Sequence, residues 1–267
     1  MSSLAVVIPA LNDAEMLQHA LEALAAQTRP VDDIVVVDNG STDATAEVAR
    51  RGGARVLFQP QRGIMSASAT GYDAVHTDLI ARIDADSRPP ADWAARVVAE
   101  LDASPAVGVL TGPGSFYGPH RWANWLGEHL YIPAYFHIVG PWLGGPPIFG
   151  SNFVMRASVW NEVRGLVHRD DPRLHDDLDL ALHLPLDVVV RYDETLRVGV
   201  SARPLESWGG LGRRLGWAYR TFAAHWPEAS PWARRAARRN WVSRAVTPAE
   251  ATDPDTAAQR PDELSAR

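Results

Sequence analysis

The chain has 267 residues, of which 46% are hydrophobic and 22% are charged, and its formal net charge at pH 7 is -6. This size and composition are typical of one large globular α/β domain with additions. The negative charge argues against bulk nucleic-acid binding, which needs a strongly basic face. The chain has no cysteine, which excludes disulfides, thiolate catalysis and cysteine-ligated zinc, and favours a cytoplasmic over a secreted protein.

The N-terminal residues MSSLAVVIPALND lack the basic region and the long apolar run of a signal peptide. We find no uninterrupted apolar span of about 18 to 20 residues, so a transmembrane helix is not expected. Residues 131–155 come closest, but four prolines and several glycines interrupt them. They do not predict one spanning helix.

Strand-like and helix-like segments alternate from residue 4 to about residue 110. The expected strands cover residues 4–8, 34–37, 54–59 and 79–83, and the expected helices follow Pro9, begin near Asp43, and cover residues 65–75 and 93–101. This alternation predicts a parallel sheet with helices on both faces. Ligands bind such sheets at the carboxyl ends of the strands.

Polar residues follow three of these strands, at Asn12-Asp13, Asp38-Asn39 and Asp84-Ala85-Asp86. Because parallel strands end at the same edge of the sheet, we expect the three segments to converge. The two aspartates of the last segment point to the same side of an extended chain. They indicate either a turn, which aspartate favours, or a site for a hard divalent cation, which prefers carboxylate oxygens.

Two common classes of nucleotide-binding protein do not fit the first strand exit. The segment PALND has none of the glycines that let a backbone approach a dinucleotide pyrophosphate, and the chain has no G-x-x-x-x-G-K loop. The sequence therefore argues against a Rossmann dehydrogenase and a P-loop NTPase.

The segments VVIPALND, VVVDNGSTDAT, IDADS, GSNFVMR and HDDLDLALHL occur in this order. As an ordered set within residues 4–185 they resemble the inverting family 2 glycosyltransferases, whose fold is of the GT-A type. The resemblance implies a single α/β domain with a mainly parallel central sheet flanked by helices. It implies transfer of a sugar from a nucleoside-diphosphate sugar to an acceptor hydroxyl or phosphate, as in hexosyltransferases, with Mg²⁺ or Mn²⁺.

The resemblance also suggests how the chain is divided. Residues 1–110 would form the nucleotide-sugar-binding half, and residues 111–202 the acceptor-binding and catalytic-base half of the same domain. Residues 203–246 would be a helical extension rich in arginine and tryptophan. Residues 247–267 are acidic and rich in proline and alanine, a composition typical of disordered chain.

The family pattern assigns donor-binding roles to residues after the first two strands. Pro9, Ala10 and Asn12 would line the pocket for the base, and Asp38 would bind the base or the ribose. Asp13 stands where the family commonly has glutamate. We interpret the neighbouring residues as turn and helix-capping residues: Asn39, Ser41 and Asp43.

The pattern places the metal mainly on Asp86, with Asp84 nearer the ribose or a metal-bound water. Both are candidate ligands. Arg62 and Gly63 precede a helix, where a diphosphate could meet a positive side chain and backbone N–H groups. An ordinary surface arginine is the alternative for Arg62.

The catalytic base would come from HDDLDL, where the family usually has Glu-Asp. We assign Asp177 as the base, Asp176 as an acceptor-binding or orienting residue, and Asp179 as a helix-surface residue. An inverting transfer needs a carboxylate that takes the proton of the attacking hydroxyl. Crowding should raise the pKa of at least one of these acids. An acidic first helical turn, stabilised by the helix dipole, is the alternative.

The acceptor site would include Gly150, which allows close approach to the backbone, and Asn152, which could bind a hydroxyl. Arg156 is interpreted as structural. The third metal ligand in this family is often a histidine, and we leave the candidates unassigned: His175, His183 and His225.

Aromatic residues are frequent in an irregular middle segment: Trp122, Trp125, Tyr131, Tyr135, Phe136 and Trp142. They could stack on sugar rings, cover a lipid chain, or form the core of a subdomain. Arginines and tryptophans of residues 203–244 could hold a peripheral helix at the inner face of a membrane, or bind the acidic domain or the donor. The acceptor would be a sugar, a lipid-linked group or another small molecule.

Two rival functions use a similar fold. One is a catalytically silent protein that binds a nucleotide sugar or acts as a scaffold, but such a protein has no need for Asp38, Asp84, Asp86 and Asp177. The other is a nucleotidyltransferase, which would need a Gly- and Lys/Arg-rich loop after the first strand. PALND does not provide that loop.

Overall fold

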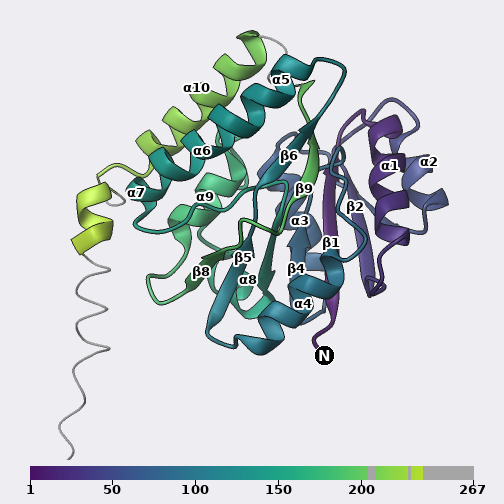
Figure 1. Cartoon of the computed structure of the whole chain (residues 1–267), viewed down its shortest axis with the longest axis horizontal. Helices are drawn as coiled ribbons and strands as arrows, with labels where there is room; N and C mark the ends of the chain where they lie inside the picture. The colour runs from purple at the N-terminus through teal and green to yellow at the C-terminus, as the bar shows by residue number, and fades with distance from the viewer. Residues whose placement is uncertain (204–207, 228–229, 237–267) are drawn as a thin grey trace, which may run out of the picture.

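The computed structural model describes residues 1–203, 208–227 and 230–236 (Figure 1). Its centre is a seven-stranded sheet with the strand order β3-β2-β1-β4-β7-β5-β8, and a second sheet pairs β6 with β9. The strands are β1 Leu4–Ala10, β2 Asp33–Asp38, β3 Arg55–Phe58, β4 Leu79–Arg82, β5 Val107–Thr111, β6 Gly114–Tyr117, β7 Phe153–Arg156, β8 Val189–Tyr192 and β9 Val198–Ser201.

The central sheet is mainly parallel. Strand β1 pairs in parallel with β2 and β4, β2 with β3, and β5 with β8, whereas β7 runs antiparallel between β4 and β5. Residues from both predicted halves of the chain therefore belong to one sheet. The predicted fold class is confirmed.

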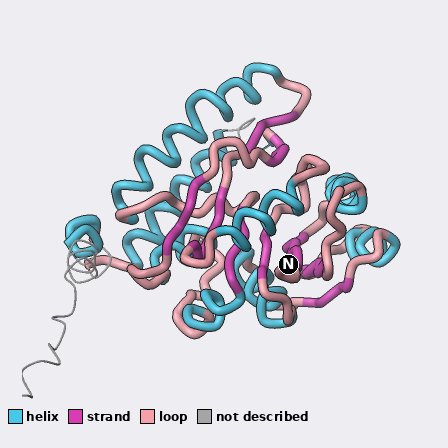
Figure 2. The backbone as a smooth tube through the Cα atoms, turned by 60° about the horizontal axis from the view of Figure 1, so that its bottom comes forward, coloured by secondary structure: helices cyan, strands magenta, loops and turns pink. Residues whose placement is uncertain are grey.

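Helices cover both faces of this sheet (Figures 1 and 2). They are α1 Ala14–Ala25, α2 Thr45–Arg51, α3 Ile64–Ala74, α4 Trp93–Ala103, α5 Arg121–Leu126, α6 Ile132–Ala134, α7 Gly140–Leu143, α8 Ala157–Val163, α9 Asp176–His183 and α10 Trp208–Ala224. Up to residue 110 the elements alternate as the sequence predicts.

Strand β1 shows why the sheet needs cover on both sides. All seven of its residues are buried. Leu4, Val6 and Ile8 pack into one apolar core with α1 and α4, whereas Ala5 and Val7 pack into a second core with α3 and α8. Such a continuous apolar strand is stable only when helices remove both faces from water.

Residues 121–143 differ from the irregular segment expected from the sequence, because they are helical throughout. Between α5, α6 and α7 lie two π-helical segments, Gly127–Tyr131 and Tyr135–Val139. Pro133 and Pro141 obscure the helix in the sequence, and each is the second residue of an α-helical segment that follows a π-helical one. Prolines and π-helical turns both interrupt the regular hydrogen-bond ladder of a helix. Gly144 ends the run with a φ of 73°.

The C-terminal extension is helical where it is described, in α10 and in residues 231–236. Helix α10 lies alongside the 121–143 helix, with the rings of Trp142 and Phe222 5.2 Å apart (Figure 1). The other extension residues and the predicted tail, residues 204–207, 228–229 and 237–267, lie outside the described part. None of the described helices is long and apolar enough to cross a bilayer.

Candidate functional site

The first two strand exits lie side by side at one edge of the sheet. Ala10 at the end of β1 is paired with Asp38 at the end of β2. Asp38 is buried, and its Oδ1 accepts the N–H of Ser41 at 2.8 Å, which holds the turn after β2. Pro9 is also buried, so Pro9 and Asp38 lie beneath the loops at this edge of the sheet and not on the molecular surface.

Loop residues around this edge of the sheet are joined by hydrogen bonds that the sequence did not predict. Asn39 donates its amide to the carbonyls of Gln59 and Gln61 and accepts the N–H of Gly63. Exposed Asn12 has a φ of 52° and accepts the N–H of Thr42 at 2.7 Å. Asparagine tolerates this left-handed conformation better than most residues.

Arg62 lies at the same edge of the sheet. It is exposed, and its Nη2 donates to the carbonyl of Gly40 at 3.1 Å. Gly40 has a φ of 82°, which favours glycine in the turn after β2. The exposed guanidinium could contact a diphosphate near this turn, but the structure does not test that contact. The donor role of Arg62 stays a prediction.

Asp84 and Asp86 follow β4 and lie close enough to repel each other. Asp84 Oδ1 is 2.7 Å from Arg82 Nη2, and its Oδ2 accepts the hydroxyl of Ser151. Asp86 lies 3.5 Å from Arg203, which also contacts Asp13 at 2.9 Å. Burial, and then the charge of Asp84, raise the pKa of Asp86 to about 7.

Two adjacent carboxylates at a strand exit suit Mg²⁺ or Mn²⁺, because hard cations prefer oxygen ligands. The loop that carries them is anchored from the second sheet. The Tyr117 hydroxyl donates to the backbone carbonyl of Asp86 at 2.6 Å, and the Arg88 guanidinium lies 4.0 Å from the Tyr117 ring centre. The chemistry of the donor set therefore fits the predicted metal.

Arg82 is a site residue that sequence reasoning missed. Its side chain is only 3% exposed, and Nη2 lies 2.7 Å from Asp84 and 3.3 Å from Asp176. Attraction to these carboxylates raises the pKa of Arg82 despite the burial that opposes its charge. The signal was available, since an arginine in the apolar strand LIARI needs buried carboxylate partners.

Asp176 and Asp177 begin α9 and face Arg82 and the turn before β7. Asp177 Oδ2 accepts the N–H of Gly150 at 2.8 Å, and its Oδ1 lies 2.6 Å from His175 Nδ1. A Cβ on Gly150 would be 2.1 Å from Arg82 Nη1. Glycine is therefore needed here for close approach of protein groups, whereas the sequence suggested close approach of substrate.

The pKa values of Asp176 and Asp177 are shifted in opposite directions. Burial raises the pKa of Asp176 above its ordinary value, although Arg82 opposes the shift. Burial acts in the same direction on Asp177, but His175, Arg82 and the Gly150 N–H outweigh it and lower the pKa of Asp177. One pKa is raised as the crowding predicts, but it belongs to Asp176 and not to the assigned base.

Asn152 does not have the position expected of an acceptor-binding residue. It is fully buried, its Oδ1 accepts the Trp93 indole N–H at 3.0 Å, and its Nδ2 donates to the Leu196 carbonyl at 2.6 Å. Its amide thus joins α4 to the chain before β9. Arg156 is structural as predicted, because it donates to the Leu101 and Val107 carbonyls.

Asp179 is a clear correction, because it is fully buried and not a helix-surface residue. Three histidines surround its carboxylate, and they are described below. The six aromatic residues also divide. Tyr131, Tyr135 and Phe136 pack around a small core, whereas the tryptophans at positions 122, 125 and 142 are exposed.

Helix α10 brings a further positive charge to the acids. Arg214 lies beside Tyr131, and its pKa is raised because contact with Tyr131 and the charges of Asp84 and Asp177 outweigh its burial. Burial and then Asp177 raise the pKa of Tyr135, whose hydroxyl donates to the Ile148 carbonyl. The extension therefore closes over the same end of the sheet.

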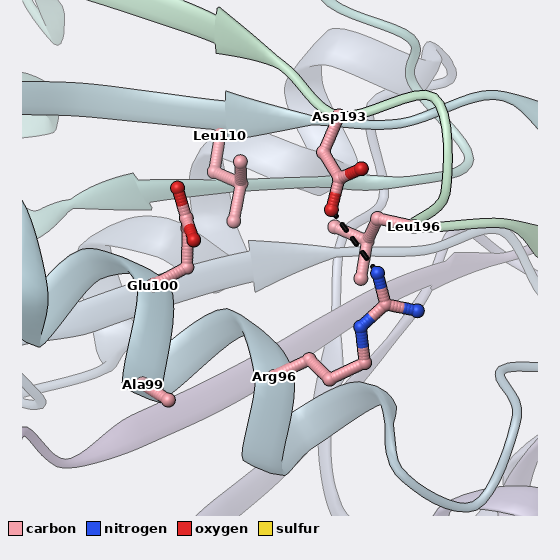
Figure 3. Close-up of a pocket in the computed structure, with 6 residues that line it drawn as sticks. All are labelled: Arg96, Ala99, Glu100, Leu110, Asp193 and Leu196. Carbon is pink, nitrogen blue, oxygen red and sulfur yellow. Dashed lines mark hydrogen bonds and ion pairs between the residues drawn. The ribbon is translucent and has the colours of Figure 1, made fainter.

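A separate pocket between α4 and the β8–β9 connection contains none of the predicted site residues (Figure 3). Arg96 lies 3.1 Å from Asp193 within it and also donates to Thr195 Oγ1 at 2.6 Å. These contacts hold the connection against α4. We interpret this pocket as structural, because its charged groups are already paired.

The sequence model described as "Glycosyl transferase family 2" matches residues 5–163, which contain all three acidic strand exits and the turn around Gly150. The chain belongs to glycosyl transferase family 2. The match ends before Asp176 and Asp177, so the family assignment does not itself test the base.

An uncharacterised glycosyltransferase of Mycobacterium tuberculosis is 45% identical to this family 2 chain over 97 residues, which are 36% of this chain and 43% of that protein. The chain therefore matches less than half the length of this relative.

Glucosyl-3-phosphoglycerate synthase of M. tuberculosis, solved with Mn²⁺, UDP and glucosyl-3-phosphoglycerate, is a structural neighbour with a TM-score of 0.60 and 22% identity. The match covers 84% of this chain and 79% of that one. TarS of S. aureus, solved with UDP-GlcNAc, has a TM-score of 0.58 and 14% identity, over 74% of this chain and 58% of that one. The shared fold is the GT-A type.

Proposed function

We propose that this chain transfers a sugar, with inversion, from a nucleoside-diphosphate sugar to an acceptor hydroxyl or phosphate. The observation that carries the proposal is the convergence of Asp84 and Asp176 on one buried arginine, Arg82. This contact supports a site in which the loop with Asp84 and Asp86 would hold the metal and the start of α9 would supply the base. Burial of these charges costs desolvation free energy, and a protein that only binds a nucleotide would have no need for such a cluster.

Asp38 with Pro9, Ala10 and Asn12 would hold the nucleoside, and Arg62 would contact the diphosphate. Asp84 and Asp86 would hold Mg²⁺ or Mn²⁺, and a cation bound there neutralises the negative charge that develops on the departing diphosphate. The Mn²⁺ and UDP in the glucosyl-3-phosphoglycerate synthase structure support this role.

Asp177 would accept the proton of the attacking hydroxyl. Its lowered pKa keeps it ionised at neutral pH, as a base must be before the reaction. Asp176 and Arg82 would orient it, the Gly150 N–H binds its Oδ2, and His175 Nδ1 lies 2.6 Å from its Oδ1. These contacts restrict rotation of the carboxylate, which favours one attack geometry.

The decisive experiment combines nucleotide binding with turnover. We expect Asp86→Ala to abolish the gain in UDP or GDP affinity that Mn²⁺ produces, measured by calorimetry. Asp177→Asn should keep that gain but lose about 100-fold or more in sugar transfer, in the range of general-base catalysis. Asp92→Ala is the matched control, since Asp92 is exposed and its side chain makes no capping bond to α4.

Unchanged Mn²⁺-dependent affinity in Asp86→Ala would remove the metal role. Full turnover in Asp177→Asn, with loss in Asp176→Asn, would move the base to Asp176, whose raised pKa makes it the other candidate. Strong Mn²⁺-dependent nucleotide binding without transfer to any sugar, lipid-phosphate or small-molecule acceptor would favour the silent binding protein.

We further propose a lipid-linked acceptor presented at a membrane surface, which would place the chain at the inner face of that membrane. Large apolar side chains are exposed along the 121–143 helix, α10 and the segment after it: Trp122, Trp125, Leu130, Ile138, Trp142, Leu215, Tyr219, Trp226 and Trp232. These helices lie side by side in Figures 1 and 2. Exposed tryptophans beside arginines are typical of helices that bind at the lipid headgroups.

A further inference from the structure

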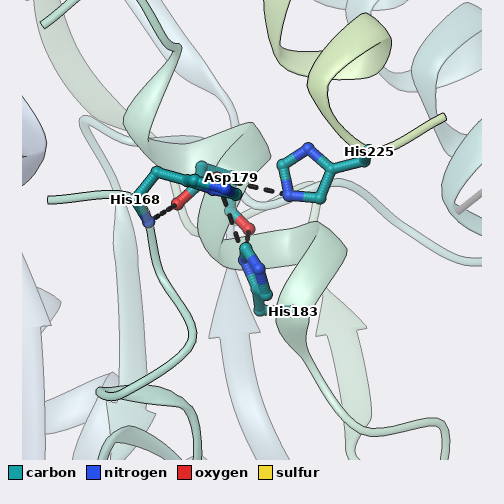
Figure 4. A group of neighbouring side chains, drawn as sticks. All are labelled: His168, Asp179, His183 and His225. Atoms are coloured by element: carbon teal, nitrogen blue, oxygen red, sulfur yellow. Dashed lines mark hydrogen bonds and ion pairs between the residues drawn. The ribbon is translucent and has the colours of Figure 1, made fainter. Parts of the chain in front are cut away.

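A second cluster of titratable side chains lies outside the proposed transfer site. It contains Asp179 and His183 on α9, His168 from the chain between α8 and α9, and His225 just after α10 (Figure 4). Each residue offers one ligand atom, and the four atoms lie within 4.8 Å of one another. The three imidazole ring centres are 4.8 to 5.3 Å apart.

Asp179 is the centre of this cluster. Its Oδ2 accepts the backbone N–H of His168 at 2.8 Å. Its Oδ1 faces the histidines, at 2.7 Å from His168 Nδ1, 3.3 Å from His225 Nε2 and 3.8 Å from His183 Nδ1. A fully buried carboxylate is thus surrounded by imidazoles from its own helix, from the chain just before that helix, and from the end of α10.

Backbone contacts set the tautomers of two rings. His225 Nδ1 lies 2.7 Å from the Thr221 carbonyl, and His183 Nδ1 lies 2.8 Å from the Asp179 carbonyl. Each Nδ1 must donate its hydrogen to that carbonyl, which leaves the Nε2 lone pair free in a neutral ring. Histidine ligands of metals commonly have their second nitrogen engaged in this way.

His225 Nε2 is the atom that needs an explanation. The His225 side chain is 9% exposed, and Nε2 is buried with no hydrogen-bond partner among the described residues. Nε2 lies 3.3 Å from Asp179 Oδ1 but out of line for a hydrogen bond, so in the neutral ring two electron-rich atoms would lie close together and repel. A positive charge at Nε2, carried either by a proton or by a metal ion, removes this repulsion.

We propose that His168, Asp179, His183 and His225 bind a structural Zn²⁺ ion. Zinc takes imidazole nitrogens at 2.0–2.1 Å and carboxylate oxygens at 2.0–2.2 Å in tetrahedral sites, so neighbouring ligand atoms lie about 3.3 Å apart. The Oδ1–Nε2 pair of Asp179 and His225 already has this spacing. His168 Nδ1, at 2.7 Å, and His183 Nδ1, at 3.8 Å from the same oxygen, lie off this spacing, so both rings would turn when the ion binds. The half-exposed His168 gives the ion a path of entry.

The ion would tie α10 to α9. Asp179 lies two residues after the proposed base Asp177 on α9, and α10 carries Arg214 over the acids. Coordination of one ion by both His225 and Asp179 would therefore fix the position of Arg214 relative to the base. This role is separate from the catalytic metal, because the cluster shares no ligand with Asp84 and Asp86.

A proton on His225 is the competing explanation. Burial, together with the charge of Arg234, acts to lower the pKa of His225, but contact with Asp179 and the Thr221 carbonyl outweighs them and raises it. His183 is different, because burial lowers its pKa and keeps that ring neutral and able to bind a metal. A proton and Zn²⁺ compete for the same lone pair, so the two explanations give opposite responses to added zinc.

The test measures Zn²⁺ binding by the full-length chain after exhaustive dialysis against a chelator. In competition with a fluorescent zinc chelator, we expect one equivalent of Zn²⁺ to bind and the melting temperature to rise. Asp86→Ala should retain this equivalent, which excludes the catalytic metal site. His225→Gln and His168→Gln should each weaken the binding at least about tenfold. Substituted Co²⁺ should give the intense visible absorption of a tetrahedral complex.

His76→Gln is the matched control, since His76 is exposed and outside the cluster, and it should bind Zn²⁺ like the wild type. His168→Gln keeps the test valid if His225→Gln does not fold, because the His168 side chain is 44% exposed. Wild-type zinc affinity no greater than that of His168→Gln, with a melting temperature insensitive to zinc, would overturn the proposal and leave the protonated pair.

Discussion

Arg82 holds two carboxylates in a place where each alone would be costly. Its guanidinium lies 2.7 Å from Asp84 and 3.3 Å from Asp176, and all three groups are at least partly removed from water. A buried ion pair adds little to stability compared with apolar residues, but loss of one partner leaves an uncompensated charge. The arginine therefore matters most for the position of the two acids.

We expect Arg82→Met to lower the free energy of unfolding by about 3–5 kcal/mol, because two buried carboxylates lose their counter-charge. Urea denaturation followed by circular dichroism measures the loss. The double variant Arg82→Met/Asp176→Asn should recover part of it, since one of the charges is removed. No recovery in the double variant would show that Arg82 acts through packing and not through its charge.

Gly150 lies between Arg82 and Asp177 with no room for a side chain. Gly150→Ala puts a Cβ 2.1 Å from Arg82 Nη1 and 2.9 Å from Asp177 Oδ2, so both groups must move. We expect kcat to fall at least about 100-fold, because displacement of a base by about 1 Å has this effect, while nucleotide affinity changes little.

Gly165→Ala is the control for this substitution, because a Cβ at position 165 meets nothing within 4 Å. Steady-state kinetics and UDP calorimetry on both variants separate turnover from donor binding. Equal kcat in Gly150→Ala and the wild type would place Asp177 outside the reaction.

At the scale of single residues, the sequence identifies the acids but not their partners. Asp84, Asp86, Asp176 and Asp177 belong to short local motifs that can be recognised in a single sequence. Arg82 and the partners of Asn152 depend on contacts between segments about 60 to 95 residues apart. No local pattern records such contacts, because many folds could bring different residues to the same place.

Helix α3 is joined to the chain around α8 by one carboxylate. Asp73 accepts the Trp160 indole N–H at 2.9 Å and an Arg169 N–H at 2.5 Å, and Arg164 lies 3.7 Å away. Burial acts to raise the pKa of Asp73, but Arg169 and Trp160 outweigh it and lower the pKa below its ordinary value. The folded state therefore stabilises the ionised carboxylate of Asp73 more than the unfolded state does.

We expect Asp73→Asn to lower the free energy of unfolding by about 1 kcal/mol at neutral pH, the upper range for a partly exposed ion pair. The sign follows from linkage. The carboxylate stabilises the fold fully above its unfolded pKa of about 3.9, and this stabilisation is lost as the pH falls through the lower folded value. Urea unfolding of both proteins between pH 7 and pH 3 should show a difference that is constant above about pH 5 and shrinks below pH 4.

Asp92→Asn is the control, because its exposed carboxylate has no comparable partners, and its difference from wild type should stay near zero throughout. A difference for Asp73→Asn that grows toward low pH would contradict the assigned direction of the pKa shift.

The elements themselves are predictable to different degrees. Up to residue 103, strands and helices follow local apolar periods and turn residues, so the sequence predicts them correctly, whereas β5 was not among the expected strands. The helix at 121–143 was missed because its prolines and glycines have poor helix propensity, and tertiary packing of Tyr131, Tyr135 and Phe136 overrides that propensity. Local rules work where local preference and packing agree.

At the scale of the whole molecule, the order of the strands decides which residues meet. The insertion of antiparallel β7 between β4 and β5 brings the Gly150 turn next to the exit of β4. The sequence alone predicts three acidic exits but not this insertion, since β7 reaches its place after a segment of more than 40 residues from β5. The family resemblance, and not periodicity, supplied the link to Asp177.

The outer face of the 121–143 helix and α10 gives the last prediction. Trp122 and Trp125 are each more than half exposed on α5, and Leu215 and Tyr219 on α10 are more exposed still. Residues 208–227 contain arginines but no acidic residue. Apolar side chains insert at the headgroup boundary, and arginines add attraction to anionic lipid that salt screens.

We expect the chain to co-sediment with vesicles that contain phosphatidylglycerol, and much less with pure phosphatidylcholine vesicles or at 1 M salt. Trp122→Ser/Trp125→Ser should reduce the bound fraction several-fold at unchanged melting temperature, because both indoles lie outside the core. Phe58→Ser, which removes an exposed aromatic ring on β3 across the sheet, is the matched control. Equal sedimentation of all three proteins with both vesicle types would show that this face does not bind lipid, and a dimer in analytical ultracentrifugation would then account for its exposed side chains.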